Sequence, residues 1–481
     1  ILLMIEITRR AAGYIIPALE AFKDNILSAL EKARIDHGEA KILGTPRRLA
    51  LIVKDVAATQ KAQTSTLTGP PKSVGFDDDG NPTLAGQKFA DKAGIPVSQI
   101  KVEQTDKGSY LTAVVEEKCE SAAAILEEMM EKQILAIPFP KSMRWGDLSI
   151  SFARPIISLV GLLGDKVLNF KVGDIESSNE IFGHEFMDFK KYTVATAEDY
   201  VETARKAGVI VEFEERKQML VDAIEACAKE NNAKILPDPE LVDIVNNLVE
   251  IPYPVVGSFD DDFLQVPDEV LITAMREHQK YFALVDDDNN LKPLFIAVNN
   301  TLARDMVLVA KGHEKVLRAR LSDAKFFYEV DLQSSLDDFA QKLKNVTFQE
   351  KLGTVYEKTQ RIEKLGCFLA ENGSFEEKDA LISNVKRASE ICKADLVSQV
   401  VIEFTKLQGV IGRAYALKAG ENEDVAHAIE QHYRPVYSGG ELPENPTASL
   451  IAIADKMDTI CGCFSVDLIP TGGADPYALR R

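Results

Sequence analysis

Tryptophan, cysteine and long apolar runs are scarce in this sequence. Its 481 residues include one tryptophan and six cysteines, and the cysteines are scattered apart from the CGC at 461–463. Neither a disulfide framework nor the paired spacing of a zinc site is present. No stretch approaches the roughly 18 apolar residues of a membrane span, and the start, ILLMIEITRR, reverses the basic-then-apolar order of a signal peptide. These features predict a cytoplasmic protein with reduced thiols and no membrane contact.

Motifs for catalysis are also missing. The sequence contains no G-x-x-x-x-G-K-[ST] loop, no G-x-G-x-x-G loop, no H-E-x-x-H helix and no serine nucleophile elbow. We therefore predict no catalytic residue, no nucleotide-binding loop and no metal site in this chain. One alternative stays open, a metal-dependent phosphohydrolase. It would need His427, His432, Asp395, Asp455 and Asp458 to converge, whereas the sequence favours core or capping roles for them.

The chain is strongly acidic, with a formal net charge of −19 and a pI of about 5.0. Such a surface repels phosphate at long range, so any contact with nucleic acid has to be local. The segment KGHEKVLRARLSDAKFFYEV, residues 311–330, offers such a place. On a helix Lys311, Lys315, Arg318 and Lys325 lie on one stripe, opposite a mainly apolar side that includes Leu317 and Leu321.

Two interpretations of this stripe remain open, a solvated helix face and a phosphate-binding surface. On the same helix Arg320 falls among the apolar positions, which predicts a buried guanidinium paired with Asp323. Elsewhere, TPRRLAL places Arg47 and Arg48 just before a strand. Neighbouring strand residues point to opposite faces, so at most one of these two arginines can serve a given surface.

The pattern of apolar residues predicts a multidomain α/β (α+β) body followed by an all-helical domain. At about 150 residues per domain the length suggests several domains. Residues 1–330 mix helical and extended patterns, which predicts two subdomains with a helical insert near 197–249. Residues 331–481 show only helical periodicity. The polar segment TGPPKSVGFDDDGNPT, residues 68–83, predicts a projecting loop.

Several long segments carry a family resemblance. They include ILGTPRRLAL, LITAMREHQKYFAL, GHEKVLRARLSDAKFFYEVDL, KADLVSQVVIEFTKLQGVIGRAYA, ADKMDTICGCF and PTGGADPYALRR. In this order they resemble the beta subunit of the bacterial heterotetrameric glycyl-tRNA synthetase, from about residue 41 to the last residue. The resemblance implies a non-catalytic, tRNA-binding and assembly subunit of an alpha2beta2 glycine-tRNA ligase. It further implies that this chain lacks the family's C-terminal anticodon-binding domain.

The resemblance also assigns partners and cofactors. The alpha subunit is expected to hold ATP, Mg²⁺ and the aminoacylation site, while this chain contacts tRNA(Gly) and binds no cofactor itself. The helical domain is expected to be HD-like, matching at Asp395 and Asp455 but without the metal-binding His-Asp dyad. The candidate tRNA-binding residues are Lys311, Lys315, Arg318, Lys325, Arg47 and Arg48. A pure scaffold protein is a further alternative.

Overall fold

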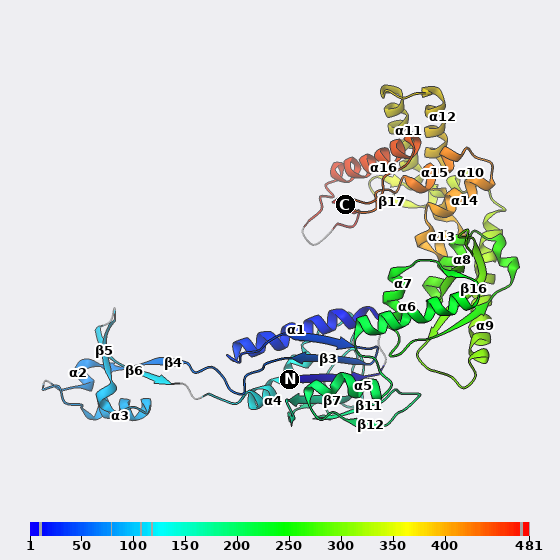
Figure 1. Ribbon diagram of the computed structural model, residues 1–481. Coiled ribbons are helices and arrows are strands. Elements are labelled where there is room, and N and C mark those ends of the chain that lie inside the picture. The colour runs from blue at the N-terminus through cyan, green and yellow to red at the C-terminus, as the bar shows by residue number, and fades with distance from the viewer. Residues whose placement is uncertain (9–11, 78, 106–107, 117–118, 472–474, 481) are drawn as a thin grey trace. The chain divides into compact units, whose positions relative to one another are not determined.

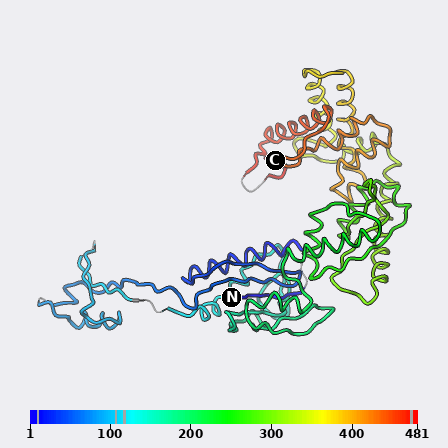
Figure 2. Tube along the Cα trace, viewed as in Figure 1, coloured from blue at the N-terminus to red at the C-terminus, as the bar shows by residue number. Residues whose placement is uncertain are grey.

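The computed structural model describes residues 1–8, 12–77, 79–105, 108–116, 119–471 and 475–480. They form two compact units. Unit 1 comprises Ile1–Val221 and Val242–Pro252, and unit 2 comprises Asp222–Leu241 and Tyr253–Arg481. Figure 1 labels the elements, and Figure 2 follows the chain through both units by colour. The predicted domain boundary near residue 330 lies inside unit 2 and stays a prediction.

A mixed sheet forms the centre of unit 1, with strand order β2-β3-β1-β7-β10-β9 and β8 paired to β7. β1 runs antiparallel to both β3 and β7, whereas β7 and β10 are parallel. The strands are β1 (Leu2–Ile7), β2 (Ala40–Gly44), β3 (Arg48–Val53), β7 (Ile156–Leu163), β8 (Lys166–Val167), β9 (Lys171–Val172) and β10 (Ile175–Ser178). A separate hairpin joins β11 (Glu180–Phe182) to β12 (Lys191–Thr193).

β1 is apolar at nearly every position because both of its faces are buried. Leu3 and Ile5 pack with α1 (Ile15–Lys32) and α4 (Ala122–Leu135) on one face. Leu2 and Met4 pack on the other face with α5 (Tyr200–Lys206). A strand covered on both sides reads as a continuous apolar run because successive side chains point to opposite faces.

Unit 1 also contains a three-stranded sheet with the order β4-β6-β5. Its elements are β4 (Thr64–Pro71), α2 (Lys72–Gly75), α3 (Leu84–Ala93), β5 (Lys101–Thr105) and β6 (Gly108–Glu116). Phe89 of α3 packs on Leu111 and Ala113 of β6. The loop predicted for residues 68–83 is wrong in its first half, because Thr68 and Pro71 pair with β6. Pro71 fits there because β4 is an edge strand of this sheet and its pairing shifts register between Thr68 and Pro71.

Unit 2 begins with an antiparallel sheet of order β13-β15-β16-β14. The extended runs predicted from the sequence form β14 (Tyr253–Ser258), β15 (Phe282–Val285) and β16 (Leu291–Asn299), joined by β13 (Lys234–Ile235). The helices around it include α8 (Asp268–Ala274) and α9 (Met306–Asp331). The helical patterns predicted near 197–249 form α5, α6 (Phe213–Glu230) and α7 (Pro239–Asn246).

Helices dominate the rest of unit 2. They are α10 (Leu336–Lys342), α11 (Val355–Asn372), α12 (Lys378–Ile391), α13 (Gln399–Glu403), α14 (Val410–Lys418), α15 (Glu423–Gln431) and α16 (Pro446–Ser465). The prediction of a purely helical region is wrong at one place, where β17 (Thr347–Gln349) pairs with β18 (Gly353–Thr354). These strands are too short to leave a periodic signal in the sequence. No helix within the described ranges is long and apolar enough to span a membrane.

Asp331, the last residue of α9, ties that helix to the helical region. Its carboxylate accepts hydrogen bonds from the backbone N–H of Gln399 at 2.8 Å and of Val400 at 3.0 Å. The hydroxyl of Tyr415 donates a third bond at 2.8 Å. Asp331 is only 3% exposed, so these donors would lose their partner without gaining water.

We expect Asp331→Ala to lower the free energy of unfolding by about 3 kcal/mol, because it leaves buried donors unsatisfied. Urea unfolding measures this change. Asp323→Ala, at an exposed position on the same helix, is the matched control and should cost less than about 0.5 kcal/mol. Equal losses for the two variants would contradict the anchoring role of Asp331.

Candidate nucleic-acid interface

α9 is fixed by a cap at its start and by one narrow buried stripe. The Asp305 side chain accepts a hydrogen bond from the backbone N–H of Leu308 at 2.9 Å, which caps the helix. Leu317, Leu321 and Ala324 are fully buried in the core of unit 2. Because these residues recur every three or four positions, they set which side of α9 faces outward.

Two polar residues of α9, His313 and Glu314, reinforce this orientation. Nδ1 of His313 accepts from the Tyr281 hydroxyl at 2.7 Å, and its Nε2 lies 2.9 Å from Oδ1 of Asn299. Burial lowers the pKa of His313, so the ring is neutral at pH 7 and matches this donor and acceptor pattern. Glu314 accepts from the backbone N–H of Ser258 at 2.9 Å.

The four predicted cations of α9 lie on its outward side, but their surroundings differ. Lys311 and Lys315 are exposed, one turn apart, and have no ion-pair partner among the described residues. Arg318 lies 3.1 Å from Asp260, and Lys325 lies 2.6 Å from Asp262. The four cations therefore lie on one side of α9 as predicted. Lys311 and Lys315 have no ion-pair partner among the described residues, whereas Arg318 and Lys325 are paired with aspartates.

Arg320 differs from its prediction. It is exposed, and no described residue forms an ion pair with it, so the predicted buried pair with Asp323 is wrong. The buried stripe of α9 is narrower than the apolar pattern suggests, because Val316 is 46% exposed. Arg320 lies at the edge of that stripe, where a long side chain reaches solvent.

Arg47 and Arg48 are buried in unit 1, at 5% and 1% exposure. Arg48 pairs with Glu250 and lies 3.1 Å from Glu6. Arg47 pairs with Glu185 and lies 3.7 Å from the same Glu6. Both arginines thus approach the carboxylate of Glu6. The sequence predicted that they point to opposite faces, but this rule does not apply to Arg47 because it precedes β3. Their guanidinium groups are not available to a nucleic acid on the surface.

The Arg48 network shifts the pKa values of its members. Burial opposes the charged form of Arg48, but Glu250 and Glu6 outweigh it and raise the pKa of Arg48. Burial likewise opposes ionisation of Glu250, yet Arg48 holds the pKa of Glu250 below its ordinary value. For Glu6 burial prevails and raises the pKa. These directions describe a structural ion-pair cluster.

A second buried cluster lies in the helical region. Lys358 of α11 contacts Asp455 at 2.7 Å and Asp458 at 3.0 Å, both on α16. Lys393 lies 2.7 Å from the other oxygen of Asp455, and Arg361 contacts Asp458 at 2.5 Å. Asp458 is buried and Asp455 is partly buried, so both are consistent with the core or capping roles predicted for them. Sequence reasoning missed Lys358 and Lys393, because their aspartate partners are 100 and 62 positions away in the chain.

Histidine and acidic residues do not gather as metal ligands in the described part of the chain. No group of three or more His, Cys, Asp or Glu side chains there is arranged to hold a metal ion. His432 is fully buried, 3.8 Å from Asp455, and its Nδ1 faces the carbonyl of Ile429 at 2.8 Å. Asp395 is fully buried and accepts from the backbone N–H of Gly409 at 2.5 Å.

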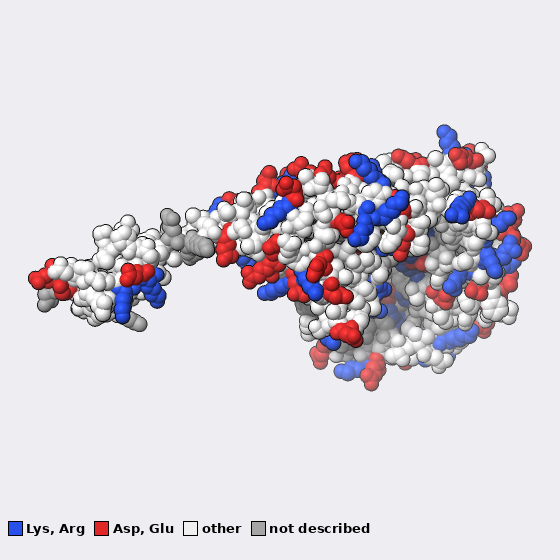
Figure 3. All heavy atoms as spheres, turned by 90° about the horizontal axis from the view of Figure 1, so that it is seen from below, with Lys and Arg blue, Asp and Glu red and all other residues white. Residues whose placement is uncertain are grey.

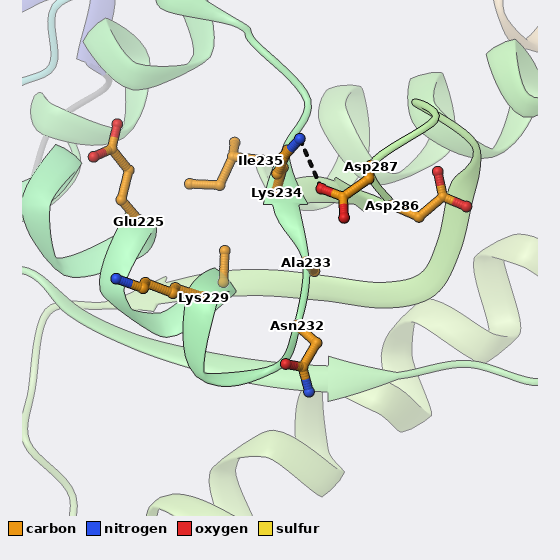
Figure 4. Close-up of a pocket in the computed structure, with 9 residues that line it drawn as sticks. Glu225, Lys229, Asn232, Ala233, Lys234, Ile235, Asp286 and Asp287 are labelled. Atoms are coloured by element: carbon orange, nitrogen blue, oxygen red, sulfur yellow. Dashed lines mark ion pairs between the residues drawn. The ribbon is translucent and has the colours of Figure 1, made fainter.

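A hollow of about 570 Å³ lies beside the start of the unit 2 sheet. Figure 4 shows its lining side chains, which carry both signs of charge. The ammonium of Lys234 pairs with Asp287 at 2.8 Å within it. With three carboxylates against two lysines, the lining offers no net attraction for an anion. Figure 3 shows the same mixing on a larger scale, with acidic and basic side chains interspersed over the face drawn.

We expect Arg48→Met to lower the free energy of unfolding by about 3–5 kcal/mol, because it removes the buried cation that pairs with both Glu250 and Glu6. Chemical denaturation measures the loss. The matched control is Arg320→Met, which removes an exposed arginine and should change stability by less than about 0.5 kcal/mol. A loss for Arg48→Met as small as the control's would contradict the buried pairing.

His432 gives unfolding a pH dependence. Burial, with Lys393 nearby, lowers its pKa to about 3, whereas an unfolded histidine titrates near pH 6.5. Below about pH 6.5 the unfolded chain takes up a proton that the folded chain does not. The free energy of unfolding therefore decreases as the pH is lowered. From pH 7 to pH 5 we expect this group to cost about 2 kcal/mol.

Denaturant titrations at pH 7 and pH 5 test the size of this effect. His432→Gln should lose about 2 kcal/mol less than the parent chain over that interval, because glutamine does not titrate. Identical pH dependence in the two proteins would show that His432 is not responsible.

Comparison with known proteins adds independent information. Residues 3–481 match the protein family described as glycyl-tRNA synthetase beta subunit. The glycine-tRNA ligase beta subunit of Desulforapulum autotrophicum is 60% identical over 470 residues, which cover 98% of this chain and 68% of that protein. With the same coverage, the beta subunits of Desulfatibacillum aliphaticivorans and Citrifermentans bemidjiense are 50% and 48% identical.

Proposed function

The chain belongs to the glycyl-tRNA synthetase beta subunit family, and from this premise we propose that it binds tRNA(Gly) and assembles with an alpha subunit as alpha2beta2. Membership makes it part of an aminoacyl-tRNA synthetase, which is a ligase. The proposed role is to support ATP-dependent attachment of glycine to tRNA without contributing a catalytic residue. ATP and Mg²⁺ then bind to the alpha subunit. The phosphohydrolase alternative is not favoured by this membership.

Two finer proposals accompany this one. Residues 331–481 form an HD-like domain without the metal dyad, a proposal that rests on the resemblance at Asp395 and Asp455. The enzyme works in the cytoplasm, where its tRNA substrate is used in translation.

The observation that carries the tRNA proposal is the outward side of α9. Lys311 and Lys315 lie one turn apart and are exposed, so two ammonium groups are available on one surface. Phosphate groups of a nucleic acid backbone attract such cations without regard to base sequence. Arg318 and Lys325 extend the surface, although each has first to exchange its aspartate for phosphate.

We expect Lys311→Gln with Lys315→Gln to flatten the dependence of log affinity for tRNA on log salt by roughly 0.7–0.9 per lost contact. Glutamine keeps helix propensity, so folding should be unchanged. Affinity for cognate and non-cognate tRNA should fall together. The measurement is tRNA binding by the complex with the alpha subunit across a salt series. Lys325→Gln should have a smaller effect because its cation is already paired.

The matched control is Lys364→Gln with Lys378→Gln, which removes two exposed lysines from α11 and α12. Net charge changes equally in the two double variants, so only a local contact distinguishes them. An unchanged salt slope for the α9 variant, or an equal change for the control, would return α9 to the interpretation of a solvated face.

A further inference from the structure

The hairpin of β11 and β12, labelled in Figure 1, carries three phenylalanines at its turn. Phe186 is 73% exposed and Phe189 is 54% exposed. Phe182, which is partly buried, stacks on Phe189 with 4.9 Å between the ring centroids and 9° between the ring planes. Because Phe182 covers one face of Phe189, the exposed part of Phe189 is its opposite face and its edge. A further flat ring can therefore be added to this stack.

Hydrogen bonds to buried residues fix the backbone of this turn. His184 is fully buried, its carbonyl accepts from the backbone N–H of Asp188 at 3.0 Å, and its Nδ1 accepts from that of Phe186 at 3.3 Å. The guanidinium of Arg48, already part of a buried ion-pair cluster, donates to the carbonyl of Phe182 at 2.7 Å. The phenylalanines therefore extend from a backbone that the core of unit 1 holds in place, so binding a ligand there costs little ordering of the chain.

Charge around the hairpin is balanced, in contrast to the acidic chain as a whole. Each of its three carboxylates pairs with a cation, and the pairs are Lys191 with Glu180 at 2.7 Å, Lys190 with Asp188 at 2.8 Å, and Arg47 with Glu185. Lys206, at the end of α5, is exposed and has no ion-pair partner among the residues that the structure describes. The carbonyl of its neighbour Ala207 accepts from the backbone N–H of His184 at 2.9 Å, which places Lys206 beside the turn. A phosphate group therefore meets one free cation here and no excess of negative charge.

We infer that Phe182, Phe186 and Phe189, here called the phenylalanine patch, stack an unpaired base of a bound RNA, with Lys206 next to the RNA backbone. The inference rests on the proposed binding of tRNA and adds the class of nucleotide that is recognised. Unpaired bases have free flat faces that stack on aromatic side chains, whereas the bases of a duplex are already stacked on each other. Phosphate contacts at α9 do not distinguish these two states of RNA, so the patch supplies a selectivity that α9 lacks.

The parallel rings favour a base over a protein as the occupant of the patch. A protein interface buries apolar side chains of any shape and has no need for two rings that are 9° from parallel. The ammonium of Lys191 lies 5.8 Å from the centroid of the Phe182 ring, which adds a cation to the stacked pair. Aromatic rings combined with cations characterise sites for single-stranded nucleic acid.

Substitutions that keep apolar area but remove the aromatic rings separate these two occupants. Phe186→Leu with Phe189→Leu should raise the Kd of the complex with the alpha subunit for tRNA(Gly) at least about fivefold, because base stacking is lost. The salt slope should be unchanged, because no cation is removed. Phe186→Tyr with Phe189→Tyr should stay within about twofold of the parent Kd, because any aromatic ring can stack a base.

The matched control is Phe368→Leu with Phe375→Leu, which removes two exposed rings from α11 and the loop that follows it. Its Kd for tRNA(Gly) should equal that of the parent. Melting temperatures of all variants should be unchanged, because the substituted side chains are exposed and leucine keeps much of their apolar area.

The outcomes separate the inference from the proposed function. Weak binding by the leucine variant with recovery in the tyrosine variant supports the inference. Equal affinity of the leucine variant and the parent overturns the inference and leaves tRNA binding intact, whereas a parent complex that binds no tRNA overturns the proposed function itself. Failure of the leucine variant to assemble with the alpha subunit, at an unchanged melting temperature, also overturns the inference, because the patch then docks a protein.

Tryptophan fluorescence provides a second, direct test of stacking. Trp145 is the one tryptophan of the chain, so Phe189→Trp combined with Trp145→Phe places a single reporter in the patch. A single-stranded RNA of about 12 cytidines should quench this fluorescence, whereas an RNA duplex of the same length should not. The control is Phe368→Trp with Trp145→Phe, which should respond to neither RNA. Equal quenching by both RNAs, or no quenching by tRNA(Gly) that is bound, overturns the inference.

Discussion

Lys358 holds α11 against α16 by contacting Asp455 and Asp458 together, and the outward surface of the helical region depends on this contact. Two carboxylates and the cations around them are taken out of water here, which carries a large desolvation cost. Such a cluster contributes little net stability compared with apolar packing. It instead fixes the orientation of α16, because Asp455 and Asp458 reach their cations only when the helix is turned this way about its axis. The outward exposure of Ile453 and Phe464 on α16 is a consequence of that orientation.

Local periodicity explains what the sequence predicts well. The buried stripe of α9 and the double-sided burial of β1 both follow from spacings of a few residues, which are visible in the chain itself. The same reasoning placed the four α9 cations on one side. It misplaced Arg320 because periodicity indicates the centre of a buried stripe more sharply than its edges, where a long side chain can turn to solvent.

Pairing between distant residues explains what the sequence does not predict. Arg48 meets Glu250 across 202 positions, and Lys358 meets Asp458 across 100. Nothing near Arg48 in the chain indicates that its partner is an equally buried glutamate. For that reason Arg48, which the sequence suggests is a surface charge, is instead buried in the core of unit 1. The core positions of Asp455 and Asp458 were predictable, because each lies within an apolar helix and needs a partner.

The aspartates beside Arg318 and Lys325 act as built-in competitors for any anion. Each exposed pair is worth about 0–1 kcal/mol, so a single phosphate gains almost nothing by replacing a carboxylate that is already in place. A polyanion differs, because one docking event replaces several carboxylates and releases many counterions at once. On the proposed tRNA surface, the pairs at Arg318 and Lys325 would therefore favour a folded RNA backbone over free nucleotides and inorganic phosphate.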